Sequence, residues 1–152
     1  MTQRMDYARA APEIFRGMLG VEKALHSGGI EPRLLHMIKL RASQINGCAY
    51  CMDMHWKDAK AAGETEERLY MLNAWRESPL YSDRERAAMA WVEAVTNITV
   101  GHAPDDLYEA TRAQFDEKQM AELTWAIASI NAWNRIAISF RATPGIYQST
   151  KA

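Results

Sequence analysis

The fold of this chain is decided by residues 41–55, which read RASQINGCAYCMDMH. The Asn-Gly pair in this stretch interrupts a helical pattern, and a new helix is expected over about 48–62. Cys48 and Cys51 then lie in its first turn. Residues three and seven positions apart share a helix face, so His55 is expected beside both cysteines.

Helical signals continue on both sides of this stretch, with proline at helix starts and two capping boxes, whereas runs typical of strands are missing. The expected helices span about 12–26, 32–45, 48–62, 65–76, 83–97 and 117–141, with another opening at Pro104. In the second of these, Leu34 and Ile38 lie on an apolar face and Lys39 lies away from it. The sequence predicts one all-α domain, residues 1–152, of six to seven helices.

The longest expected helix has a middle that is apolar on nearly every side. Its large side chains are Leu123, Trp125, Ile127, Ile130 and Trp133. Such a helix must be covered on most sides, which favours burial in an interface between subunits. Asn131 and Asn134 interrupt the apolar surface, and we expect them to make structural hydrogen bonds.

The composition is that of an ordinary soluble globular protein, with 48% hydrophobic and 24% charged residues. A net charge of -1 without a dense Lys/Arg run predicts no nucleic-acid partner and no binding to an anionic membrane. The longest uncharged stretch, 123–134, is shorter than the roughly 20 residues of a membrane span. Residues 1–11 lack the apolar run of a secretory signal, so a cytoplasmic location is expected.

The two cysteines are suited to thiol redox chemistry. Helical residues three apart have Cα atoms roughly 5 Å apart, within the range of a disulfide. A helix N-terminus and a nearby imidazolium lower a thiol pKa from about 8.5 to about 7 or below. Because a helical side chain leans toward the preceding turn, His55 reaches Cys51 more easily than Cys48. We therefore expect Cys51 to attack and Cys48 to resolve.

Zinc binding is the main alternative use of these side chains. Cys48, Cys51 and His55 supply three ligands, but a structural zinc site needs four. The remaining candidates are His26, His36 and His102, of which His26 and His102 are expected in loops. The sequence favours redox chemistry with no metal and no cofactor. A disulfide reductase for protein partners, or a redox-sensing or zinc-binding helical module without turnover, stays open.

Residues 34–63 closely resemble the core of the AhpD-like alkylhydroperoxidases, which belong to the carboxymuconolactone decarboxylase superfamily. The most specific part is 41–51, RASQINGCAYC, and the likeness continues through 74–76, Ala-Trp-Arg, and 130–135, INAWNR. The resemblance implies an all-α fold, assembly into trimers or hexamers, and thiol-dependent reduction of hydroperoxides. The expected partners are a small hydroperoxide and a dithiol reductant such as a lipoyl domain or a peroxiredoxin.

The resemblance also assigns roles to individual residues. It gives Cys51 the peroxide-attacking role, Cys48 the resolving role and His55 a place in a proton relay. The family has a glutamate of the relay at the position of His36, and a histidine can also move protons near neutral pH. Tyr50 lies between the cysteines, and its hydroxyl is a candidate contact for the bound substrate.

Overall fold

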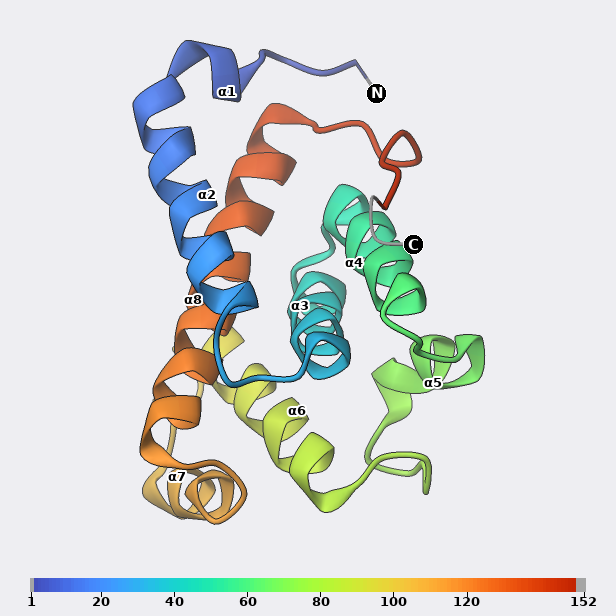
Figure 1. Ribbon diagram of the computed structural model, residues 1–152, viewed down its shortest axis with the longest axis vertical. Coiled ribbons are helices and arrows are strands. Elements are labelled where there is room, and N and C mark those ends of the chain that lie inside the picture. The colour runs from blue at the N-terminus through green and yellow to red at the C-terminus, as the bar shows by residue number, and fades with distance from the viewer. Residues whose placement is uncertain (1, 150–152) are drawn as a thin grey trace.

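The computed structural model describes residues 2–149, in which eight α-helices and one short 3-10 helix are found and no strand (Figure 1). The elements are α1 (Tyr7–Ala10), α2 (Pro12–His26), α3 (Pro32–Asn46), α4 (Ala49–Ala61), α5 (Glu66–Met71), η1 (Leu72–Ala74), α6 (Asp83–Thr96), α7 (Asp105–Arg112) and α8 (Glu117–Phe140). The all-α prediction is confirmed.

Most helix ends lie within two residues of their predicted positions, because local signals set them. The predicted capping boxes are present at Ser82 with Glu85 and at Asp116 with Gln119. Two predictions were wrong. The segment expected to be one helix over 65–76 is α-helical only as far as Met71, and the chain then forms the 3-10 helix η1. Helix α1 was not predicted, because its four residues are too few for a periodic pattern.

The centre of the molecule is α3, which packs against α4, α6 and α8. Figure 1 shows α8 running along much of the molecule, with α2 beside it and α7 at one end. Because α3 is covered along most of its length, three of its polar residues, His36, Lys39 and Ser43, are buried. Lys39, predicted to lie away from the core, is 1% exposed and forms an ion pair with Glu22 of α2. The periodicity of α3 alone could not reveal this partner.

The middle of α8 is covered within the same chain. Leu123, Ile127 and Ile130 are fully buried, so the prediction that they need a subunit interface was wrong. Trp125 is 65% exposed. An interface between copies of the chain stays a prediction, and this exposed side chain is what supports it. No helix in the described part of the chain is both long enough and apolar enough to span a membrane.

Candidate functional site

The junction between α3 and α4 is a two-residue link that ends one helix and starts the next. Gly47 has a φ of +70°, and the Cys48 N–H donates to the Ser43 carbonyl at 3.0 Å, closing α3. Cys48 has extended backbone angles, and its Sγ accepts a hydrogen bond from the Cys51 N–H at 3.4 Å. Cys48 is thus the N-cap of α4, and the helix begins one residue later than expected.

Side-chain amides hold this junction against α8. The Asn46 side chain donates to Asn131 at 2.9 Å and to Asn134 at 2.8 Å. Asn134, which is fully buried, donates in turn to the Ser43 hydroxyl at 3.0 Å. The prediction that Asn131 and Asn134 make structural hydrogen bonds is confirmed, and these bonds connect the end of α3 to α8.

Cys48 and Cys51 form a disulfide with their Cα atoms 5.3 Å apart, and each residue is 1% exposed. The two cysteines lie on different hollows. Cys51 and His55 line a cavity of about 260 Å³, whereas Cys48 lines a separate groove of about 530 Å³ beside the end of α8. Cys51 and His55 therefore line one cavity, and Cys48, the N-cap residue before the helix, does not line it.

The cavity at Cys51 is mainly apolar. Phe15 and Leu19 of α2, Met54 of α4 and Trp133 of α8 form much of its wall. The Phe15 and Trp133 rings pack edge to face with centroids 5.7 Å apart. Tyr50 lies between the two hollows and lines both. Its position suits the predicted contact with the substrate, which stays a prediction.

Three histidine rings form a row on the polar side of this cavity. The His55 and His36 ring centroids are 5.9 Å apart, and those of His36 and His26 are 5.6 Å apart. His55 is 5% and His36 1% exposed, whereas His26 is exposed. The expectation that His26 belongs to a loop was wrong, because it is the last residue of α2. His102 does lie in a loop, before α7.

His55 has an unusual electrostatic environment. Burial lowers its pKa well below the ordinary value, and the nearby Lys39 and His36 lower it further. The imidazole is therefore neutral at neutral pH. In the described part of the chain, neither ring nitrogen of His55 has a hydrogen-bond partner. A neutral ring of this kind can accept a proton from a thiol or bind a metal ion.

Glu22 is a carboxylate of the cavity that is already engaged by other groups. It pairs with Lys39 and accepts hydrogen bonds from the Ser129 hydroxyl at 2.7 Å and the Trp133 indole at 3.0 Å. Burial would raise its pKa, but Lys39 and these hydrogen bonds outweigh burial and lower it. Its partners are distant in sequence, so the sequence analysis had no signal for this residue.

Asp58 is a second carboxylate of the cavity, and the C-terminal segment covers it. Its Oδ1 accepts a hydrogen bond from the Tyr147 hydroxyl at 2.8 Å, while Lys57 donates to the Tyr147 carbonyl at 2.9 Å. Burial, with Asp58 beside the hydroxyl, raises the pKa of Tyr147 to about 12. Asp58 was not predicted from the sequence, although its place three residues after His55 puts both on one face of α4.

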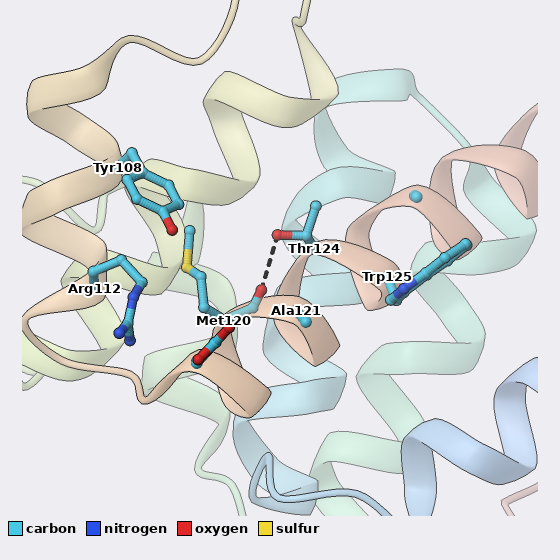
Figure 2. Close-up of a pocket in the computed structure, with 8 residues that line it drawn as sticks. Tyr108, Arg112, Met120, Ala121, Thr124 and Trp125 are labelled. Atoms are coloured by element: carbon cyan, nitrogen blue, oxygen red, sulfur yellow. Dashed lines mark hydrogen bonds between the residues drawn. The ribbon is translucent and has the colours of Figure 1, made fainter.

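A different hollow, of about 490 Å³, lies between α7 and α8 (Figure 2). Figure 2 shows Tyr108 and Arg112 on one side and Trp125 on the other, with the Thr124 hydroxyl donating to the Met120 carbonyl at 2.9 Å. Neither a cysteine nor a histidine is among its lining residues. Thiol chemistry is therefore possible at the Cys51 cavity and not here.

Comparison with known sequences places the chain in a family. The model of the carboxymuconolactone decarboxylase family matches residues 12–94. The chain belongs to this family. The uncharacterized protein YdfG of Bacillus subtilis is 44% identical to this chain over 139 residues, covering 91% of this chain and 95% of YdfG. The uncharacterized protein YnjA of Escherichia coli is 32% identical over 103 residues, covering 67% of this chain and 56% of YnjA.

Solved structures support the AhpD-like assignment within the carboxymuconolactone decarboxylase family. A protein of unknown function from Agrobacterium tumefaciens, proposed to be an antioxidant defence protein AhpD, is 45% identical with a TM-score of 0.92, covering 96% of this chain and all of that one. A peroxidase-related protein from Ralstonia eutropha, with an AhpD core, and the debrominase Bmp8 are each 20% identical with TM-scores of 0.81. They cover 91% and 90% of this chain and 74% of their own, and show the fold alone. The predicted AhpD-like assignment is confirmed.

Proposed function

We propose that this protein reduces organic hydroperoxides through a dithiol–disulfide cycle of Cys48 and Cys51, assisted by His55. The observation that carries this proposal is the position of Cys51, which joins the disulfide and also lines an apolar cavity together with a buried, neutral His55. The apolar wall suits the carbon group of an alkyl or aryl hydroperoxide. The reacting sulfur and a proton acceptor then meet the substrate in one space.

In the first step, the Cys51 thiol gives its proton to His55, and the thiolate attacks the terminal peroxide oxygen. The O–O bond breaks, Cys51 becomes a sulfenic acid, and the departing alkoxide takes the proton from His55 and leaves as the alcohol. A neutral imidazole is needed at the start because an imidazolium cannot accept the thiol proton. Tyr50 is proposed to donate a hydrogen bond to the bound oxygen.

His36 is proposed to replace the family glutamate as the second member of the proton relay. Its ring lies between His55, which is buried, and His26, which is exposed. Protons exchanged at His55 can therefore reach solvent along three titratable rings. This arrangement gives His26, which the sequence analysis set aside, a place at the outer end of the relay.

In the second step, the Cys48 thiol attacks the Cys51 sulfenic acid, which forms the disulfide and releases water. A dithiol reductant, for which a lipoyl domain or a peroxiredoxin is the proposed partner, then reduces the disulfide. Cys48 lines the larger groove outside the substrate cavity, so we propose that the reductant attacks its sulfur from that groove. The protein is proposed to act in the cytoplasm as a trimer or hexamer.

Stopped-flow measurement of thiol loss with cumene hydroperoxide tests the order of these steps. We expect the reduced wild-type protein to lose two thiols per chain and Cys51→Ser to lose none rapidly. Cys48→Ser should stop after one turnover as a sulfenic acid that dimedone traps. His102→Gln, altered in a loop before α7, is the matched control. If Cys51→Ser reacts as fast as the wild type, the proposed mechanism is wrong.

The alternative is a protein disulfide reductase, or a redox sensor without peroxidase turnover. A wild-type protein that reduces lipoyl or peroxiredoxin disulfides but does not lose its thiols to cumene hydroperoxide would favour the reductase. His36→Glu, assayed with a dithiol reductant, asks what the family glutamate contributes. A gain in peroxidase turnover would show that His36 is the weaker relay residue.

A further inference from the structure

We propose that His36, His55 and Asp58 form a binding site for a divalent transition-metal ion such as Zn²⁺. One ligand atom from each side chain lies within 4.8 Å of the other two, and all three residues are buried. His55 and Asp58 lie one turn apart on α4, and His36 comes from α3, which packs against it. The site is thus built by two tightly packed helices.

The spacing of the three groups is close to that of a coordination shell. A tetrahedral zinc ion with ligand bonds of about 2.1 Å holds its ligand atoms roughly 3.4 Å apart. Ligand atoms at most 4.8 Å apart reach that spacing by small side-chain rotations. Two imidazoles and one carboxylate are also a ligand set that binds zinc and ferrous iron and leaves a position open.

Burial leaves the polar ring nitrogens of His55 in need of a partner. It is 5% exposed, and within residues 2–149 neither ring nitrogen makes a hydrogen bond. Burying a polar group without a partner costs free energy, and most buried polar atoms avoid this cost by bonding. A metal ion at one ring nitrogen would remove part of the cost.

The groups around the three ligands are also suited to a cation. The Tyr147 hydroxyl donates to Asp58 Oδ1 at 2.8 Å, which orients the carboxylate and leaves its second oxygen for the ion. Lys39, whose positive charge acts on His55, is paired with the carboxylate of Glu22, which opposes that charge. The adjoining cavity of about 260 Å³ has room for water at an open coordination position.

This site differs from the zinc site considered from the sequence, which used both cysteines. Its three ligands contain no sulfur, so it is complete while Cys48 and Cys51 are joined in the disulfide. It also replaces the expectation that the chain binds no metal. If the proposed peroxidase mechanism holds, a bound ion occupies the His55 nitrogen that the relay needs, and zinc inhibits turnover.

Calorimetric titration of Zn²⁺ into the disulfide form of the full chain tests the proposal without measuring activity. We expect one ion per chain, and a loss of affinity of at least roughly tenfold in both His36→Gln and Asp58→Asn. His102→Gln is the matched control and should bind as the wild type does. Equal affinity in the wild type, His36→Gln and Asp58→Asn, or no zinc binding by the wild type, would overturn the proposal.

A second measurement on the wild type keeps the test valid if a core variant fails to fold. Histidine ¹⁵N resonances should shift for His36 and His55 when zinc is added, while that of His102 stays in place. Zinc binding without a shift at either buried ring would refute the site. Since both readouts use the oxidised protein without peroxide, a failed peroxidase assay leaves their interpretation unchanged.

Discussion

Gly47 allows a direct test of the left-handed backbone conformation at the α3–α4 junction, next to Cys48. Its φ is +70°, and a Cβ added there meets no atom within 4 Å. Gly47→Ala therefore adds left-handed backbone strain without a collision. Gly17, an exposed residue inside α2, also has nothing within 4 Å, but its backbone is helical. The same substitution at these two positions should have opposite effects on stability.

The magnitudes follow from backbone conformation alone. The left-handed region costs a residue with a Cβ about 1–2 kcal/mol, and the more restricted unfolded chain returns about 0.4–1 kcal/mol. Gly47→Ala should therefore lower the free energy of unfolding by about 1 kcal/mol. Gly17→Ala should raise it by about 0.5–1 kcal/mol, because alanine favours a helix over glycine. Gly47→Asn should have a free energy of unfolding close to that of the wild type, since asparagine tolerates the left-handed region.

Urea unfolding of the disulfide form, followed by circular dichroism, measures these differences directly. The slope of free energy against urea should be unchanged, so that the midpoints report stability alone. A chain of about 150 residues shifts its melting temperature by roughly 2–4 °C for each kcal/mol, which gives an independent check. Left-handed strain at position 47 is refuted if Gly47→Ala is as stable as the wild type, or if Gly47→Asn loses as much stability as Gly47→Ala.

Three further predictions concern charge, burial and assembly. Glu93→Gln should lower the free energy of unfolding by about 2 kcal/mol at neutral pH, because Glu93 accepts hydrogen bonds from Arg41 and Trp75. Burial would raise the Glu93 pKa, but these bonds lower it, so the stability that Glu93 contributes is lost as pH falls through its native pKa. Urea unfolding at several pH values tests whether the difference in free energy of unfolding between wild type and Glu93→Gln shrinks in acid. A difference that stays constant would contradict this prediction. Asn134→Ala removes one buried and one partly buried hydrogen bond and leaves a cavity, and should lower the free energy of unfolding by about 3 kcal/mol in the same assay. A cost below about 1 kcal/mol would mean that the network is dispensable. If the exposed Trp125 indole lies in an interface, Trp125→Glu should shift the protein toward monomer in sedimentation velocity. A wild-type protein that sediments as a monomer would refute the predicted interface.

Local signals were sufficient to predict most of the helices and part of the site. The capping boxes of α6 and α8, and proline at the start of α2 and α3, gave helix ends close to those observed. Capping works through hydrogen bonds between residues three apart, so it can be read from a short window. The spacing of Cys51 and His55 likewise predicted that they share a helix face, and in the structure both line one cavity.

The amino-acid sequence by itself therefore determined an all-α chain with a Cys48–Cys51 pair and His55 close to Cys51. Only the tertiary structure placed Cys48 on a separate groove, buried Lys39 against Glu22, and brought Asp58 together with His36. These contacts join helices that are separated along the chain. Helical periodicity shows which residues share a face, but the packing of α2, α3, α4 and α8 decides what each face meets.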